Sequence, residues 1–149
     1  MAHGLLDKKV AESGLPWTID SAGTGHWHIG KLPDPRSIKC ADGHGLDITY
    51  QRARQFEVVD FDRFDQIYVM DRQNLKVLEG LSRSEDDLTK VELIMNVISP
   101  DREEIVPDPF HNGQENFEKV YEVLDKVTDQ IVTNAIDAQA ERFQVRHGL

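Results

Sequence analysis

Cysteine is nearly absent from this sequence, in which Cys40 is the single thiol. One cysteine excludes an intramolecular disulfide and any metal site that needs several thiolates. Long apolar runs are missing as well, since no stretch approaches the length of about 18 residues that crosses a bilayer. Nothing near Met1 has the charged and apolar segments of a signal peptide, so we expect a cytoplasmic protein with no membrane partner.

Basic residues are also scarce. The 149 residues contain 17 Lys and Arg against 27 Asp and Glu, which gives a formal net charge of −10. Nucleic acids and anionic membranes need clustered positive charge, so we expect neither as a partner. An acidic protein can still carry a locally positive site for a small anion. The length, with 39% hydrophobic and 30% charged residues, is typical of one globular domain.

Four segments have the signals of helices: a capping residue at one end, or apolar residues every three or four positions. They are the stretch before Gly14, the stretch from Asp34 and Pro35 to Gly43 or Gly45, the stretch after Asp71, and a long one from Phe117 to Ala135. The periodicity weakens past Ala138, so we expect residues 139–149 to be a polar C-terminal extension.

Three short apolar runs with β-branched or aromatic residues are predicted to be strands: Trp17–Ala22, Gln66–Met70 and Val91–Met95. Strands that alternate with helices indicate an α/β fold with a mainly parallel sheet. Three strands make a small sheet, and such domains usually begin with a central strand whose loop enters the first helix. We therefore expect that a strand and loop ahead of Met1 are absent from this chain.

A series of motifs, in a fixed order and spacing, covers the chain from Met1 to about Ile131. They are Met1-Ala2, Asp20-Ser21-Ala22-Gly23-Thr24-Gly25, Trp27-His28-Ile29-Gly30, Pro33-Asp34-Pro35-Arg36, His44-Gly45, Arg52-Ala53-Arg54-Gln55, Phe61 through Phe64-Asp65, Met70-Asp71 with Asn74, and Val106-Pro107-Asp108-Pro109-Phe110. Together they resemble the low-molecular-weight protein-tyrosine phosphatases. The resemblance implies a three-layer αβα fold of the phosphotyrosine protein phosphatase I type, as one N-terminally truncated domain over residues 1–149. The family sheet has four parallel strands, and its central first strand is the one this chain lacks.

The same resemblance implies an activity and a site. The family hydrolyses phosphotyrosine in proteins, and small aryl phosphates, through a phosphocysteine intermediate. Asp108 matches the general acid and base, and partial burial beside Pro109 is expected to bring its pKa toward the working pH. Trp27 and Phe110 match aromatic residues that wall the slot for the substrate ring. The resemblance implies no cofactor and no metal, and a monomer or weak homodimer.

The catalytic loop of the family, Cys-x-x-x-x-x-Arg-Ser, is missing from this sequence. The residue six positions after Cys40 is Leu46, not arginine. Cys40 falls on the helix predicted after Asp34, where a thiol lacks the cradle of amide groups that makes a reactive thiolate. We therefore expect Cys40 to be structural, and the chain as given to be inactive unless a nucleophile loop completes it.

Three further residues match positions that support the catalytic loop in the family, namely Ser21, Gln51 and Asp71. Each also has an ordinary structural explanation. Asp71 is a good N-cap for the helix that follows it, and Ser21 suits a turn that its hydroxyl stabilises.

Four alternatives remain open from the sequence. Zinc binding by His26, His28, His44 and His111 is disfavoured, because residues two apart in an extended segment point to opposite sides and no Glu or Cys has ligand spacing beside them. An arsenate reductase of the same fold needs additional cysteines for its thiol relay. The others are a catalytically dead homologue that binds a partner through the aromatic rim, and a fragment that does not fold alone.

Overall fold

The computed structural model describes residues 1–111 and 113–147. Its helices are α1 (Ala2–Ser13), α2 (Pro35–Gly43), α3 (Asp60–Arg63), α4 (Arg72–Leu81), α5 (Glu85–Thr89) and α6 (Gln114–His147), with a 3-10 turn η1 (Ile94–Val97). The strands β1 (Ile67–Val69) and β2 (Val91–Leu93) pair in parallel, with Tyr68 opposite Glu92. Parallel strands need a crossover connection, which α4 and α5 supply here.

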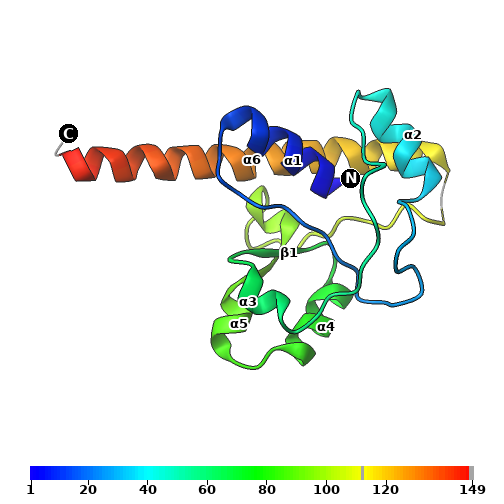
Figure 1. Ribbon diagram of the computed structural model, residues 1–149, viewed down its shortest axis with the longest axis horizontal. Coiled ribbons are helices and arrows are strands. Elements are labelled where there is room, and N and C mark those ends of the chain that lie inside the picture. Colours follow the sequence, from blue (N-terminus) through cyan, green and yellow to red (C-terminus); the bar gives the residue numbers. More distant parts are fainter. Residues whose placement is uncertain (112, 148–149) are drawn as a thin grey trace.

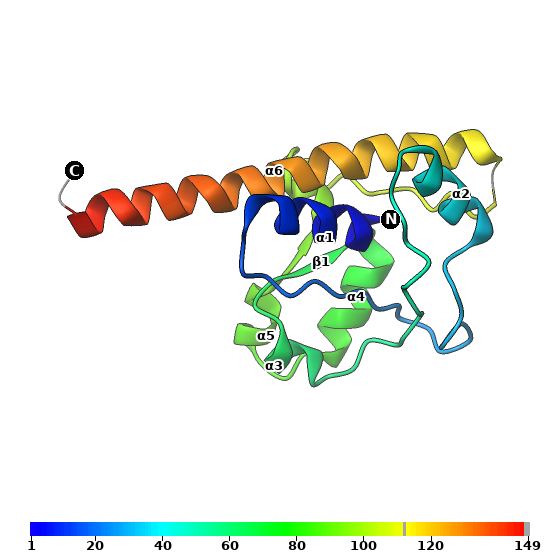
Figure 2. The same ribbon diagram turned by 45° about the horizontal axis from the view of Figure 1, so that its top comes forward.

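The elements form three layers (Figures 1 and 2). Helices α1 and α6 lie side by side on one face of the strands, and α3, α4 and α5 lie on the other face. Alternate residues of β1, together with Met70, which follows it, face the two helical layers. Val69 packs with Phe61 and Leu78 beneath α3 and α4, whereas Tyr68 and Met70 contact the core beneath α1 and α6. The predicted α/β fold with a parallel sheet between helical layers is confirmed.

Three helix boundaries predicted from the sequence are confirmed: the end of α1 and the starts of α2 and α4. Gly14 ends α1 in the left-handed region, at φ 67°, where a side chain would be strained. The carboxylate of Asp34 accepts a hydrogen bond of 2.8 Å from the backbone N–H of Arg36 at the start of α2. Asp71 does the same for the N–H of Asn74 in α4, at 2.7 Å. Each aspartate satisfies a donor that the helix itself leaves unpaired.

The strand predicted at Trp17–Ala22 is wrong, because this segment forms no strand. Its partly buried Ile19 packs against the core beneath α1 and α6, so its apolar pattern does bring it to the interior. A strand also needs a hydrogen-bonded neighbour, however, and within the described residues β1 pairs only with β2. The β pairing next to this segment is one isolated parallel bridge, between Gly23 and Gln55.

The strand predicted at Val91–Met95 is confirmed only as far as Leu93. Ile94 and Met95 are both buried in the core beneath α1 and α6. Successive residues of a strand point to opposite faces, so two adjacent residues cannot both be buried on one side in a regular strand. The chain turns into η1 instead.

The C-terminal helix is longer than the periodicity indicates. α6 continues past Ala138 to His147, while residues 148 and 149 of the predicted extension lie outside the described residues. From Ile136 to Gln144 its side chains are exposed, and Figure 1 shows this part of α6 projecting beyond the other elements. In the described ranges, no helix has both the length and the apolar character needed to span a membrane.

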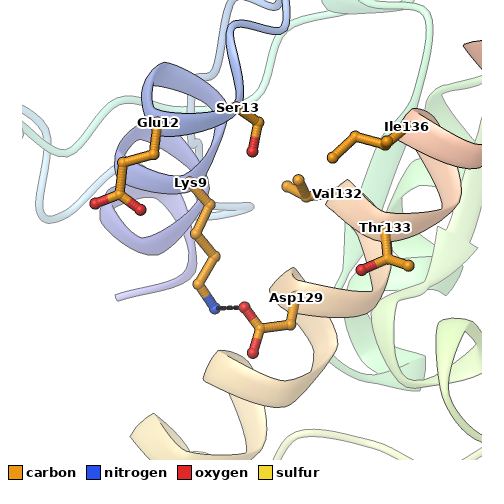
Figure 3. A pocket seen from close by; sticks show the side chains of 7 residues that line it. All are labelled: Lys9, Glu12, Ser13, Asp129, Val132, Thr133 and Ile136. Carbon is orange, nitrogen blue, oxygen red and sulfur yellow. Dashed lines mark ion pairs between the residues drawn. The ribbon is translucent and has the colours of Figure 1, made fainter.

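Lys9 ties α1 to α6. Its ammonium donates to the carboxylate of Asp125 at 2.7 Å and to the hydroxyl of Thr128 at 2.9 Å, and it pairs with Asp129 at 2.7 Å. Figure 3 shows the open hollow beside this lysine. The hollow is also lined by Glu12, Ser13, Val132, Thr133 and Ile136. The ammonium of Lys9 is already paired with Asp125 and Asp129. The hollow lies beside the C-terminal half of α1, away from the residues that the sequence associates with a site.

Candidate active site

The loop that carries Asp108 is attached to the carboxyl end of β1. The backbone N–H of Val106 donates to the carbonyl of Met70 at 2.9 Å, so the chain reaches Asp108 two residues beyond this contact. In parallel α/β sheets, ligands bind at the carboxyl ends of the strands. Asp108 therefore lies on the side of the sheet where a substrate is expected.

The carboxylate of Asp108 is exposed, so the partial burial expected from the sequence is not observed. One of its oxygens accepts a hydrogen bond of 3.0 Å from the N–H of Phe110. This local bond closes a turn around Pro109 and fixes the direction of the carboxylate. The prolines on both sides, Pro107 and Pro109, restrict the same segment.

Arg36 connects this loop to the start of α2. Its guanidinium lies over the ring of Phe110, at 5.3 Å from the centroid, and over the ring of Phe117, at 4.7 Å. Asp34 holds the guanidinium through two bonds, at 3.1 and 2.8 Å. The hydrogen bond to Asp34 raises the pKa of Arg36 above its usual value, and the charges of Asp34 and Asp108 add to the effect. The positive charge is thus fixed beside the proposed acid.

Trp27 lies on a separate loop and is 67% exposed. Its indole covers Gly25, so a Cβ there would lie 2.6 Å from a ring carbon and the exposed indole would have to move aside. Backbone bonds from Gly30 to Ala53 (2.7 Å) and from Ala53 to Lys31 (2.9 Å) anchor the loop. Within the described part of the chain no ring contact joins Trp27 to Phe110, so the structure presents the two predicted slot walls separately.

Ser21 and Gln51 both lie at the N-terminal end of α1. The hydroxyl of Ser21 is 2.8 Å from Nδ1 of His3 in the first turn. Gln51 is close enough that a Cβ on Gly4 would lie 3.2 Å from its amide nitrogen. Asp71, in contrast, is at the carboxyl end of β1, where it caps α4. The structure therefore places two of the residues predicted to support the catalytic loop at α1 and the third at the edge near Asp108.

The sequence does not point to His3, whose ring lies beside Ser21. Its Nε2 is 3.1 Å from the carboxylate of Asp7, one helical turn later, and this carboxylate also accepts from the hydroxyl of Tyr50. The contact orients the ring toward Ser21. The signal available in the sequence was the spacing of four residues between His3 and Asp7, which places both on one face of a helix.

Cys40 is confirmed as a structural thiol. It is 1% exposed, in the last turn of α2. Burial, followed by the hydrogen bond and the charge of Glu118, raises the pKa of the thiol from 9.0 to about 12. A nucleophilic cysteine needs the opposite shift, because only the thiolate attacks. Cys40 cannot serve as the nucleophile of a phosphatase.

Comparisons with known proteins show the family of this chain. The family model described as low molecular weight phosphotyrosine protein phosphatase matches residues 1–142. The low molecular weight phosphotyrosine protein phosphatase of Schizosaccharomyces pombe is 36% identical over 124 residues, which are 81% of this chain and 78% of that protein. The low molecular weight protein-tyrosine-phosphatase of Streptomyces coelicolor is 34% identical over 149 residues, covering 95% of this chain and 87% of that protein.

Solved structures show the same architecture. The crystal structure of a protein tyrosine phosphatase from Entamoeba histolytica superposes with a TM-score of 0.84 and 24% identity, covering 93% of this chain and 88% of that one. With the sequence relatives, this defines an α/β protein of the phosphatase class. The chain belongs to the low molecular weight phosphotyrosine protein phosphatase family. Its family function is that of a protein-tyrosine phosphatase, which is a hydrolase.

Proposed function

We propose that these 149 residues supply the acid–base catalyst and the substrate-binding walls of a protein-tyrosine phosphatase. The observation that carries the proposal is the tether between Val106 and Met70, which holds Asp108 at the carboxyl end of the strands. In this proposal Trp27 and Phe110 contact the substrate ring, and Ser21 and Asp71 support the phosphate-binding loop.

In this proposal Asp108 transfers one proton in each of the two steps of the reaction. A thiolate attacks phosphorus while the bond between phosphorus and the tyrosyl oxygen breaks. The protonated Asp108 gives its proton to that oxygen, so tyrosine leaves as a neutral phenol. The resulting carboxylate then takes a proton from the water that attacks the phosphocysteine, which releases phosphate and restores the thiolate.

The thiolate has to come from residues other than Cys40. The sequence contains no cysteine with an arginine six positions later, and the thiol of Cys40 is buried in the last turn of α2. We infer that the missing loop lies at the first turn of α1. Helix N-termini bind anions, and Ser21 and Gln51 are close to this turn. We propose that the family strand and loop, joined ahead of Met1, complete the site.

The test compares two proteins of verified mass with p-nitrophenyl phosphate. The 149-residue chain is expected to show no turnover, and the chain extended by a family strand and Cys-x-x-x-x-x-Arg-Ser loop is expected to turn over. In the extended chain, Asp108→Asn is expected to lower kcat by a factor of about 10² to 10³, because the leaving phenolate then lacks its proton donor.

The matched control is Asp101→Asn, which changes an exposed acid of the same connecting segment. It is expected to leave kcat of the extended chain unchanged. Turnover by the 149-residue chain, or an unchanged kcat in Asp108→Asn, contradicts the proposal.

We further propose that the protein acts in the cytoplasm as a monomer or weak homodimer. The single free and buried cysteine supports a reducing compartment, since secreted domains of this size often carry disulfides. Light scattering across a concentration series checks the oligomeric state, and a stable higher oligomer contradicts it.

A further inference from the structure

Three side chains with metal-binding donor atoms meet where α2 ends against α6. Cys40 lies in the last turn of α2, His44 caps that helix, and Glu118 comes from the second turn of α6. One donor atom from each residue, namely a sulfur, a ring nitrogen and a carboxylate oxygen, lies within 4.8 Å of the other two. None of these residues takes part in the proposed hydrolysis.

The distances between the donor atoms are close to those of a metal site. Nε2 of His44 is 2.7 Å from a carboxylate oxygen of Glu118, and the sulfur of Cys40 lies within 4.8 Å of the donor atoms of both residues. Around a tetrahedral zinc ion with bonds of 2.0–2.3 Å, neighbouring ligand atoms are about 3.3–3.6 Å apart. An ion therefore fits if His44 and Glu118 separate by less than about 1 Å and both donor atoms come to within about 3.6 Å of the sulfur, which now lies within 4.8 Å of them.

The surroundings hold two of the three ligands in place. Cys40 is 1% exposed and cannot change its position without disturbing the core. The ring of His44 stacks on the ring of the buried Tyr121, with centroids 3.9 Å apart and planes 10° apart. The side chains of His44 and Glu118 are 39% and 44% exposed, which leaves a path from solvent to the donor atoms. Such a fixed set of ligands costs little entropy to assemble around an ion.

We propose that Cys40, His44 and Glu118 form a zinc site that joins α2 to α6. A thiolate together with an imidazole favours zinc over the hard ions magnesium and calcium, which prefer oxygen ligands. On binding, a bond forms between zinc and sulfur while the thiol proton leaves to solvent. His44 binds as neutral imidazole through Nε2, and Glu118 binds as carboxylate, so the two negative charges balance the ion. Water takes the fourth position.

The competing explanation is a hydrogen-bonded cluster in which Glu118 accepts from both Cys40 and His44 without any metal. The two explanations differ in what added zinc does. A cluster that is complete without an ion gains nothing from zinc, whereas a metal site binds it saturably and stabilises the fold.

The first test uses the wild-type chain, reduced and without a histidine tag. Titration with zinc against a chromophoric chelator is expected to give one equivalent bound. At a free zinc concentration about 100 times Kd, Tm is expected to rise by about 5–10 °C, reversed by EDTA. Magnesium is expected to give neither effect. Cobalt in place of zinc is expected to give the near-ultraviolet charge-transfer absorption of a thiolate bond, and its absence overturns the proposal.

The second test removes one ligand at a time. Cys40→Ser, His44→Gln and Glu118→Gln are each expected to weaken zinc binding more than about 100-fold, since loss of an outer partner alone costs about 10–100-fold. The matched controls are His28→Gln and Glu122→Gln, at exposed positions outside the cluster. They are expected to bind within about threefold of wild type.

Binding that persists in Cys40→Ser overturns the proposal, as does equal weakening in the controls. A variant that fails to fold does not obscure the result, because the cobalt spectrum is recorded on the wild-type chain. The readouts do not depend on phosphatase activity, so this proposal and the proposed function fail or succeed separately.

Discussion

Gly4 determines how closely other segments pack against the N-terminal end of α1. A Cβ at this position would lie 2.6 Å from Cγ2 of Ile48 and 3.2 Å from the amide nitrogen of Gln51. Ile48 is completely buried, so it has no room to move aside. The absence of a side chain at Gly4 allows the chain around Ile48 to lie directly against the helix and brings Gln51 to the proposed site.

Gly4→Ala is therefore expected to destabilise the fold by about 1–3 kcal/mol, the usual cost of overpacking a core. Urea unfolding followed by circular dichroism measures the change. Gly80→Ala is the control, because Gly80 lies in α4 and a Cβ added there would meet open space. It is expected to stabilise by about 0.5–1 kcal/mol through helix propensity. Equal effects of both substitutions contradict this account of Gly4.

The sequence predicted the local structural roles of single residues better than their surroundings. Asp71 is the expected cap, and Cys40 is the expected structural thiol, because local sequence decides both. The exposure of Asp108 was not predicted, since it depends on how the loop lies on the rest of the fold. Cys40 and Glu118 are far apart in the chain, so the sequence pattern does not reveal that their donor atoms lie within 4.8 Å of each other.

At the scale of elements, Arg83 joins α3 to the start of α5. Its guanidinium pairs with Asp62 at 2.7 Å and with Asp87 at 3.0 Å. The hydrogen bonds from the side chain and the backbone N–H of Arg83 lower the pKa of Asp87 from 3.8 to about 2. A carboxyl whose pKa is lower in the folded state stabilises the fold above its unfolded pKa and loses this contribution as pH falls through the folded value.

The difference in Tm between the wild-type chain and Asp87→Asn is therefore expected to be constant above about pH 4 and to shrink as pH falls toward 2. Calorimetry across this range measures it. Asp86→Asn, on the neighbouring exposed residue, is the control and is expected to give a small difference at every pH. A difference for Asp87→Asn that does not change with pH contradicts the role of the ion pair.

Elements were predictable where local signals decide them and not where pairing does. The starts of α2 and α4 follow from aspartates that cap their own helices. The segment Trp17–Ala22 has the residues of a strand, yet strand formation depends on a hydrogen-bonded neighbour that sequence pattern does not reveal. The short α3 and α5 carry too few residues for a periodic pattern.

At the scale of the whole molecule, α6 has two parts with different roles. From Phe117 to Val132 its inner face is buried against α1, α2 and η1. Beyond Ala135 the described side chains are exposed, and Figure 2 again shows this part away from the other elements. The first part belongs to the core, and the second contributes little to it.

Removing residues 139–149 is therefore expected to change Tm by less than about 2 °C, because exposed positions contribute little to stability. Removing residues 125–149 also deletes the partners of Lys9 and the buried Val127, and is expected to abolish cooperative unfolding. Differential scanning calorimetry distinguishes the two. A large loss of stability in the shorter deletion contradicts this division of α6 into a core part and a part that contributes little.

The projecting helix also determines how the protein tumbles. With 34 residues α6 is about 50 Å long, whereas a compact sphere with the radius of gyration of about 15 Å expected for 149 residues is about 40 Å across. Rotational diffusion is then anisotropic, slower for turning the helix end over end than for spinning about its axis. Nitrogen-15 relaxation rates of amides whose bonds lie along α6 therefore differ from those of amides that lie across it.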